Sequence, residues 1–316
     1  MSHGKDIKII SGNSNIPFAE SVSRNLGIRL CSTNVTTFSD GEISVSLNET
    51  VRGSDVFIIQ STCYPVNEHI MEMLIMCDAC RRASASRITL VVPYFGYARQ
   101  DRKAKSRDPI SAKLVANIIT STGADRVLTM DLHAPQIQGF FNIPVDHLIA
   151  MPTMAAYYQS HMDPDSKYVV MAPDVGSINR ARQFATKLNL PLAIVDKRRP
   201  DANESEVVNI IGEVEDRKII ICDDLVDTAG TLCNAAVAIS EKGAIGISAC
   251  ATHAVLSGPA IERLQNSPIE ELVFLDTIMV PDEKRLDKMV ILPCAPVFAE
   301  AISRIYSDKP ISPLVN

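Results

Sequence analysis

The 316-residue sequence lacks three features, and each absence excludes or disfavours a broad class of protein. No apolar stretch approaches the roughly 20 residues of a membrane-spanning helix. Basic residues are not in excess: 31 Lys and Arg face 37 Asp and Glu, and the net charge of −6 argues against a general nucleic-acid binder. The C-x-x-C pair Cys77 and Cys80 has no second ligand pair, so core packing is favoured over metal or redox chemistry.

What is present is typical of a globular protein, with 46% apolar and 22% charged residues. The N-terminus enters a strand pattern almost at once and shows no apolar core of a signal peptide. Several cysteines (Cys222, Cys250 and Cys294) lie in apolar runs. We therefore expect a cytoplasmic protein with reduced core thiols.

Short apolar runs alternate with amphipathic runs along the whole chain. Continuous apolar strands between helices indicate parallel sheets covered on both faces, which bind ligands at the carboxyl ends of their strands. The predicted strands are 7–10, 56–60, 88–92, 126–130, 168–171, 218–222, 245–253 and 272–275. The predicted helices are 16–26, 66–83, 111–122, 178–188, 231–241 and 260–264.

A weak internal repeat suggests two α/β units. The apolar pattern that ends at Leu26 and Ile28 recurs at Leu188 and Leu190, an offset of 162 residues (188 − 26). We expect an N-terminal domain over residues 1–150 and a second domain over 151–302, which agrees with roughly 100–200 residues per domain.

The stretch KIIICDDLVDTAGT, residues 218–231, places acids beside a phosphate cradle. The apolar run ends at Asp223 and Asp224, and Asp227 opens a run of small residues before a helix start. Free backbone N–H groups in such a turn bind phosphate. Carboxylates accept hydrogen bonds from vicinal hydroxyls and hold Mg²⁺, so the acids would face the sugar and metal of a phosphorylated pentose.

Two long polar stretches, residues 97–109 and 197–206, interrupt the regular pattern. Either could close over an anion, but each alone is more often a solvated surface loop. Lys197 and Arg199 alternate with Arg198, so in an extended segment both would point to one face, where two cations suit a diphosphoryl group.

Several long motifs together resemble the ribose-phosphate pyrophosphokinase family, of the phosphate-activated class I. They lie between Ile9 and Ile311 and are DDLVDTAGT, FSDGE from Phe38, PVNEH from Pro65, PYFGYARQDRK from Pro93, DLHAPQIQGF from Asp131 and DKRRP from Asp196. The first also resembles the fingerprint of the type I phosphoribosyltransferase fold. The resemblance implies an α/β protein with two tandem domains of that type, each a mainly parallel sheet flanked by helices, and a tail, 303–316, that packs back on the first domain.

The resemblance also implies an enzyme that transfers the diphosphoryl group of ATP to ribose 5-phosphate, with Mg²⁺ as cofactor, for nucleotide biosynthesis. It implies catalytic roles for Lys197 and Arg199 and metal-associated roles for His133 and Asp174. The implied ATP site is Phe38, Asp40, Gly41, Glu42, Arg99, Gln100 and Asp101. The implied ribose-5-phosphate site is Arg199, Asp223, Asp224, Asp227, Thr228, Ala229, Gly230 and Thr231.

The family further implies a homohexamer, an active site between the two units completed by the Phe38 loop of a neighbouring subunit, and no nucleic-acid or membrane partner. Inorganic phosphate as activator and ADP as inhibitor would bind at Arg52 and Ser312. Two alternatives are a phosphoribosyltransferase and a non-catalytic regulatory relative; the intact Lys197 and Arg199 favour the enzyme. The chain departs from the family at residues 175–177, where Ser177 replaces a usual glycine, and at Pro313.

Overall fold

The computed structural model describes residues 4–198 and 207–315 and contains two compact units. Unit 1 comprises residues 1–149, 277–279 and 293–316, and unit 2 comprises residues 150–276 and 280–292. The segment that returns to unit 1 is thus longer than the predicted tail, 303–316. The division into independently folding domains near residue 150 stays a prediction.

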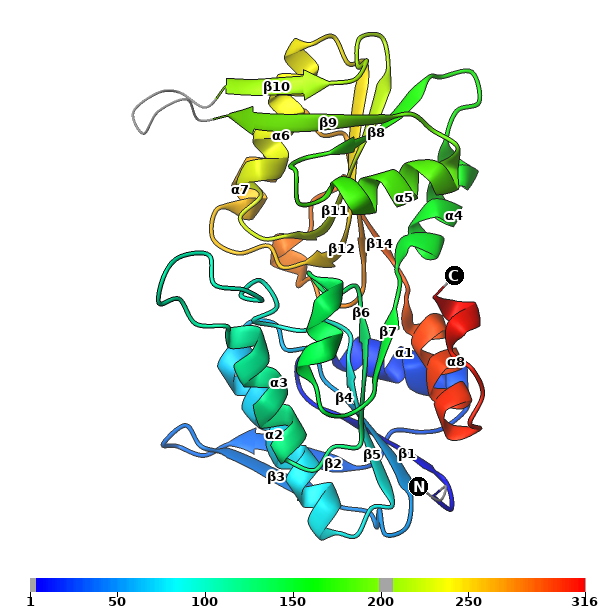
Figure 1. Ribbon diagram of the computed structural model, residues 1–316. Coiled ribbons are helices and arrows are strands. Elements are labelled where there is room, and N and C mark those ends of the chain that lie inside the picture. Colours follow the sequence, from blue (N-terminus) through cyan, green and yellow to red (C-terminus); the bar gives the residue numbers. More distant parts are fainter. Residues whose placement is uncertain (1–3, 199–206, 316) are drawn as a thin grey trace. The chain divides into compact units, whose positions relative to one another are not determined.

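Unit 1 is built on a five-stranded, entirely parallel sheet in the order β1-β4-β5-β6-β7. A separate antiparallel hairpin, β2–β3, lies alongside α2 (Figure 1). The strands are β1 (Ile7–Ser11), β2 (Thr33–Thr37), β3 (Ile43–Leu47), β4 (Asp55–Ile59), β5 (Arg87–Val92), β6 (Arg126–Met130) and β7 (Val145–Leu148). The helices are α1 (Ile16–Leu26), α2 (Val66–Arg82), α3 (Ser111–Ser121), η1 (Pro135–Phe140), α8 (Ala295–Tyr306) and η3 (Ser312–Leu314).

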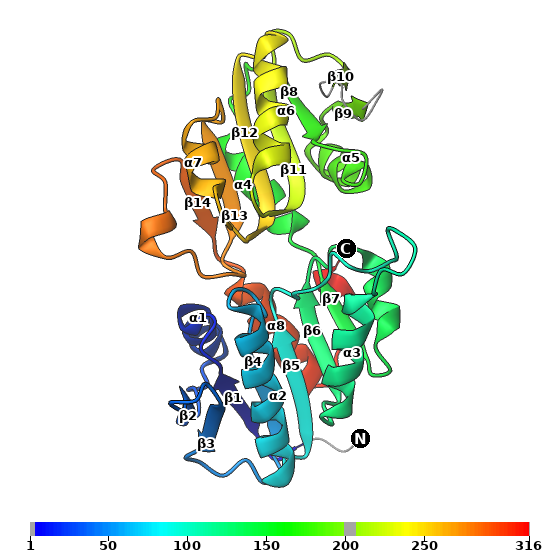
Figure 2. The same ribbon diagram turned by 90° about the vertical axis from the view of Figure 1, so that its left-hand side faces the viewer.

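Helices cover both faces of the unit 1 sheet. Figures 1 and 2 show α2 and α3 on one face and α1 and α8 on the other. The α1–α8 contact includes Phe18 and Phe298, whose rings meet edge to face with centroids 5.3 Å apart. This contact attaches the C-terminal helix to the body of unit 1.

Unit 2 repeats the design with a seven-stranded sheet in the order β10-β9-β8-β11-β12-β13-β14. Its hairpin, β9–β10, joins the sheet edge because β9 pairs with β8. The strands are β8 (Tyr168–Ala172), β9 (Leu192–Arg198), β10 (Val207–Ile211), β11 (Lys218–Val226), β12 (Gly246–Ala254), β13 (Glu271–Leu275) and β14 (Met289–Leu292). The helices are α4 (Met151–His161), α5 (Ile178–Leu188), α6 (Gly230–Glu241), α7 (Ala260–Gln265) and η2 (Asp282–Lys284).

The predicted repeat is confirmed by the helices α1 and α5, whose starts and ends both differ by 162 residues (178 − 16 and 188 − 26). Their termination is also alike: Gly27 and Asn189 each end a helix in the left-handed conformation, with φ of 69° and 55°. The two helices therefore follow their strands in the same way in both units.

Two predicted boundaries differ from the structure by more than one residue. The strand that was expected to stop at Cys222 continues to Val226, because its pairing with β12 continues past Asp223. The basic stretch that was expected to leave the sheet at residue 197 is still strand through Arg198, paired with β10. The hairpin strands β2, β3, β9 and β10, the edge strands β7 and β14, and the helices α4 and α8 were not among the predicted elements.

The interpretation of the cysteines as core thiols is confirmed. All eight are free; seven are buried and Cys31 is half-buried. Cys77 and Cys80 are fully buried on α2. Across the described residues 4–198 and 207–315, no helix is both long enough and apolar enough to cross a membrane.

Candidate active site

The carboxyl edge of the unit 2 sheet gathers three of the predicted acids. Asp223 and Asp224 lie within β11, and Asp174 follows the neighbouring strand β8. Burial raises the pKa of the Asp223 carboxyl well above its ordinary value, and the negative charges of Asp224 and Asp174 raise it further. Mutual repulsion of this kind is relieved by a cation or by hydroxyl donors.

The predicted phosphate loop leads directly into α6, and the start of that helix has no side-chain cap. Ala229, the residue before the helix, adopts φ 59° and ψ 5°. The first helical hydrogen bond is donated by the Cys233 N–H to the Ala229 carbonyl. Within the described chain, the N–H groups of Gly230, Thr231 and Leu232 have no protein acceptor, as expected of an anion-binding helix start.

Two neighbours outside the loop hold it in place. The Ser257 hydroxyl donates to the Asp227 carboxylate, and the Ser257 N–H donates to the Asp227 carbonyl at 3.1 Å. From α7, the Arg263 guanidinium donates to the Thr228 carbonyl at 2.9 Å. Arg263 was not predicted as a site residue; it brings a positive charge to the loop, and its place on a regular helix gives no sequence signal.

Asp174 is held in a tight turn at the start of α5. Its Oδ1 accepts the Ser177 N–H at 2.9 Å and the Ser177 hydroxyl at 3.1 Å. Ser177 itself has φ −88° and ψ −2°, an ordinary conformation for a residue with a side chain. The turn therefore does not need glycine at position 177, and the departure of this chain from its family there is accommodated.

In unit 1, the predicted adenine platform lies at the tip of the β2–β3 hairpin. The Phe38 side chain is 58% exposed, an unusual state for a phenylalanine, and Asp40, Gly41 and Glu42 beside it are also exposed. The Phe38 N–H donates to the Glu42 carbonyl at 2.7 Å, and Gly41 turns the chain with φ 95°. The tip thus presents an aromatic ring with two carboxylates.

The predicted residues Arg99, Gln100 and Asp101 follow β5 in the loop before α3. The Gln100 carbonyl accepts the Ala112 N–H at 3.2 Å, and the Gln100 side chain accepts a hydrogen bond from the Ser111 hydroxyl. The Asp101 carboxylate accepts the Gln136 amide at 2.8 Å. This last bond joins the loop to the segment after β6, which carries His133.

His133 is exposed two residues after Asp131, which is buried and adopts φ 40°. The following N–H, from Leu132, donates to the His147 Nε2 at 2.9 Å, so a histidine on β7 orders the His133 segment. His147 was not predicted as a site residue. His133 belongs to unit 1 and Asp174 to unit 2.

Of the two predicted catalytic cations, only Lys197 is among the described residues, near the end of β9. The backbone of Lys197 pairs with Val208 of β10, so this residue is part of a strand. Arg199 lies outside the described residues.

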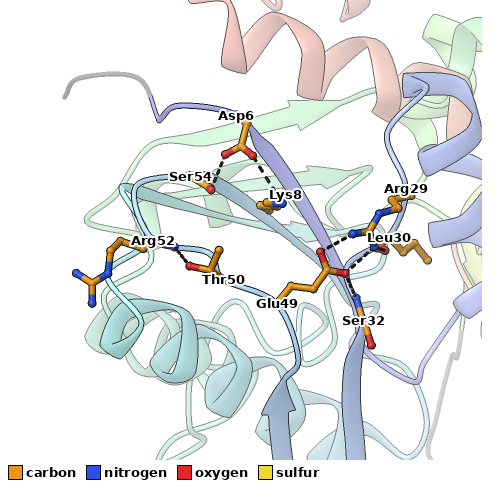
Figure 3. Close-up of polar contacts among 9 residues, drawn as sticks. All are labelled: Asp6, Lys8, Arg29, Leu30, Ser32, Glu49, Thr50, Arg52 and Ser54. Carbon is orange, nitrogen blue, oxygen red and sulfur yellow. Dashed lines mark hydrogen bonds and ion pairs between the residues drawn. The ribbon is translucent and has the colours of Figure 1, made fainter.

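The predicted regulatory residues both belong to unit 1. The Arg52 N–H donates to the Thr50 hydroxyl at 3.4 Å, and the exposed Arg52 guanidinium points away from the other side chains drawn in Figure 3. Ser312 is the exposed first residue of η3. Their binding of phosphate or ADP stays a prediction.

The acids of unit 2 suit Mg²⁺ by their donor chemistry. In the described part of the chain, no three His, Cys, Asp or Glu side chains form a ready-made metal cage. Mg²⁺ does not need one, because it commonly binds one or two carboxylates and takes its other ligands from substrate phosphates and water. Asp223 and Asp224, whose carboxylates repel each other, fit that role.

Comparison with known proteins gives consistent matches over almost the whole chain. A family model for the N-terminal domain of ribose phosphate pyrophosphokinase matches residues 7–123, and one for a phosphoribosyl synthetase-associated domain matches residues 200–316. The ribose-phosphate pyrophosphokinase of Clostridium perfringens is 59% identical over 314 residues, 99% of this chain and 98% of that protein. That of Caldanaerobacter subterraneus subsp. tengcongensis is 60% identical over 308 residues, covering 98% and 97%.

A solved structure agrees. The phosphoribosylpyrophosphate synthetase of Mycobacterium smegmatis superposes with a TM-score of 0.92 at 38% identity, over 96% of this chain and 100% of that one. Fold and site define an α/β protein with an uncapped helix start at the carboxyl edge of a mainly parallel sheet. The chain belongs to the ribose-phosphate pyrophosphokinase family, whose members are enzymes of the transferase and kinase type. The fold prediction of two tandem parallel α/β units is confirmed.

Proposed function

We propose that the protein transfers the β,γ-diphosphoryl group of ATP to the anomeric hydroxyl of D-ribose 5-phosphate, giving 5-phosphoribosyl 1-diphosphate and AMP for nucleotide biosynthesis. The observation that carries this proposal is the segment from Asp223 to Thr231, which combines two adjacent acids with an uncapped helix start. The family membership of the chain supports the same reaction.

The sugar phosphate binds in the loop Asp227, Thr228, Ala229, Gly230 and Thr231. Its oxygens accept from the N–H groups at the start of α6, and the adjacent Arg263 adds a favourable positive charge. Asp223 and Asp224 accept hydrogen bonds from the ribose hydroxyls. This arrangement fixes the anomeric oxygen relative to the loop.

ATP is bound by Phe38, Asp40, Gly41 and Glu42 at the hairpin tip and by Arg99, Gln100 and Asp101 in the loop after β5. The Phe38 ring stacks on the adenine base, and the acids accept from its exocyclic amine. Arg99 contacts the opposite face of the ring.

In the transfer, the anomeric oxygen forms a bond to the β-phosphorus of ATP, and the bond from that phosphorus to the α,β-bridging oxygen breaks. AMP leaves with the bridging oxygen, and the hydroxyl proton is released. Lys197 and Arg199 stabilise the charge that develops on the diphosphoryl oxygens, since such reactions depend on positioning and electrostatics. Bound Mg²⁺ would neutralise phosphate charge. Asp174, Asp223 and Asp224 of unit 2 are residues that would hold it, and His133 of unit 1 keeps its proposed metal-associated role.

We also propose that the protein acts in the cytoplasm as a homohexamer, with inorganic phosphate as activator and ADP as inhibitor at Arg52 and Ser312. The support is the family membership, the exposed guanidinium of Arg52 and the eight free thiols. Light scattering at several concentrations tests the assembly. Phosphate titration of the Arg52→Ala variant tests the regulatory site.

The reaction is tested by incubating purified protein with ATP, ribose 5-phosphate, Mg²⁺ and phosphate. AMP and phosphoribosyl diphosphate in equal amounts, formed only when the sugar is present, are the expected products. ADP in place of AMP would show transfer of a single phosphoryl group and overturn the mechanism. A folded protein without turnover would favour a non-catalytic regulatory relative, and consumption of phosphoribosyl diphosphate with a free base would favour a phosphoribosyltransferase.

A further inference from the structure

The hairpin that carries Phe38 is not part of the main sheet of unit 1. Strands β2 and β3 pair only with each other. In unit 2, by contrast, the hairpin strand β9 is hydrogen-bonded to β8 at Leu192, Ala193 and Ile194. A backbone ladder therefore fixes the register of one hairpin, and something else must fix the other.

One side chain supplies the polar connection. The Asn13 Nδ2 group, just after β1, donates to the Val35 carbonyl of β2 at 3.2 Å. Among the described residues, and apart from the local bond from the Ser46 hydroxyl to the Asn48 side chain, this is the only hydrogen bond between residues 34–46 and the body of unit 1. The half-buried Val35 and Val45 also pack on the unit 1 core, but apolar contact is non-directional and does not fix the position of the tip.

Glu72 on α2 determines which way the Asn13 amide points. Glu72 is buried, and its Oε1 accepts the Asn13 Nδ2 at 2.7 Å while its Oε2 accepts the Asn13 N–H at 3.1 Å. A carboxylate only accepts, so Asn13 must turn its NH₂ group toward Glu72. The same NH₂ group then faces the Val35 carbonyl.

The carboxylate is itself held by a buried amide. Gln60, at the end of β4, donates from Nε2 to Glu72 Oε2 at 2.6 Å and accepts the Ser14 N–H at Oε1 at 3.1 Å. A Cβ atom at Gly12 would lie 2.3 Å from the Gln60 Oε1, so a larger residue there would displace Gln60. The connection to the hairpin thus starts from groups fixed to the sheet.

The repeat shows that this arrangement is particular to unit 1. The 162-residue offset aligns Asn13 with Val175, an exposed apolar residue that cannot donate from its side chain. Unit 2 does not need a side-chain hydrogen bond of this kind, because β9 is already paired with β8.

We propose that Asn13 and Glu72 are positioning residues for nucleotide binding: through the bond to Val35 they set the place of the hairpin tip and hence of the Phe38 ring. This inference rests on the proposed function, in which Phe38 contacts adenine. Neither residue is assigned a contact with substrate.

The test compares Glu72→Gln and Asn13→Ala with the control Asp78→Asn, which removes an exposed carboxylate from the same helix. Hydrogen exchange of the amides in residues 34–46 is measured in each full-length protein, together with KM for ATP and for ribose 5-phosphate. Both test variants should raise hairpin exchange and KM for ATP about five- to tenfold, the effect of one or two lost hydrogen bonds. KM for ribose 5-phosphate and all values for the control should stay within about twofold.

Each result decides the inference. Hairpin exchange equal to that of the control, in folded variants, would overturn it. Faster exchange with an unchanged KM for ATP would also overturn it, because the Asn13–Val35 hydrogen bond would then hold the hairpin without affecting nucleotide binding. Asn13→Ala removes a side chain from an exposed position, so it tests the Asn13–Val35 hydrogen bond even if Glu72→Gln fails to fold. If the wild type makes no phosphoribosyl diphosphate, the proposed function fails. The affinity of each variant for ATP, measured by calorimetry, still tests whether Asn13 and Glu72 position the hairpin for nucleotide binding.

Discussion

The two units of this chain share one design and differ in what lies at corresponding positions. Ile7 pairs with Asp55 in unit 1, and Val169, 162 residues after Ile7, pairs with Ile219 in unit 2. Each unit then continues with strands and helices in the same order. Corresponding residues can therefore be found by counting along the paired strands.

At the carboxyl ends of β4 and β11, corresponding positions in the two units carry different groups. Counting from the pairs above, Ile59 corresponds to Asp223, and Gln60 corresponds to Asp224. In unit 1 the position is filled by protein groups, since Gln60 is bonded to Glu72 and to the Ser14 N–H. In unit 2 it carries two acids that repel each other. Hydrogen bonds within the protein thus occupy this position in unit 1, and two adjacent carboxylates occupy it in unit 2.

The hairpins provide the largest expected difference. Lys197→Ala, in unit 2, should lower kcat by about three to four orders of magnitude, or about 4–5.5 kcal/mol of barrier, with KM for ATP nearly unchanged. Phe38→Ala, in unit 1, should instead raise KM for ATP about tenfold with a smaller change in kcat. Steady-state kinetics on both variants measures this. Arg198→Ala is the matched control, and an equal loss of kcat in Arg198→Ala would contradict the assignment of Lys197.

A second difference concerns stability. Unit 1 buries the ion pair Asp55–Arg87, with Arg87 Nε 3.1 Å from the carboxylate and a further bond to the Ile305 carbonyl of α8. The corresponding neighbours in unit 2 are Ile219 and Ile247, which pair in the same register. Arg87→Ala leaves an uncompensated buried charge and should lower the free energy of unfolding by about 3–5 kcal/mol. Urea denaturation measures this.

The apolar pair in unit 2 suggests the control. Asp55→Leu combined with Arg87→Met replaces both charges and should recover most of the stability that Arg87→Ala loses. If the double variant is no more stable than Arg87→Ala, then the attachment of α8 by Arg87 matters more than the buried charge.

The acids Asp223 and Asp224 should lower the stability of the folded protein, whereas Gln60, at the corresponding place in unit 1, should raise it. The folded-state pKa of Asp223 lies above its ordinary value of 3.8, so the unfolded chain ionises first and stability falls as pH rises above about 4. Asp223→Asn should therefore stabilise the protein by about 1 kcal/mol, or about 2–4 °C, at pH 7 and abolish activity. Thermal unfolding at pH 7 and pH 4 measures this. A gain of the same size at both pH values would exclude ionisation as its cause.

The smallest expected effect lies at the base of the unit 1 hairpin. Glu49 accepts from Arg29 at 2.6 Å and from the Ser32 N–H at 2.8 Å (Figure 3). These bonds lower the Glu49 pKa from 4.5 to about 2, and the bond from Arg29 has the largest effect. Their contribution is present above pH 4.5 and is lost as pH falls toward about 2. Glu49→Gln should destabilise the protein slightly at pH 7 and less at pH 2.5, and the difference should shrink in high salt. A salt-independent difference would contradict an electrostatic cause.

The sequence allowed the regular elements of both units to be predicted where one signal dominated. Helices α1 and α5 were predicted at their observed bounds, since each carries an apolar stripe that begins and ends with turn residues. The small-residue loop after β11 was predicted because its run of Thr, Ala and Gly before a helix start is a local pattern. These signals are local, and a single sequence contains them.

The missed features depend on contacts between distant residues. The hairpin strands β2 and β3 are rich in Thr and Ser and only half-buried, so they lack a clear apolar pattern. The continuation of β11 through Asp223 follows from its pairing with β12. The support of Asp101 by Gln136 spans 35 residues, and no local pattern indicates it.

The distribution of thiols has a practical consequence for probing this molecule. Because the other seven cysteines are buried, the half-buried Cys31 is the thiol that an alkylating reagent should reach most easily in the folded protein. Its pKa is raised, chiefly by burial, so coupling will be slow at neutral pH and will improve under alkaline conditions. Cys31 lies two residues before β2. A fluorophore attached there would lie at the base of the hairpin and would test whether the hairpin moves during turnover, without any engineered cysteine.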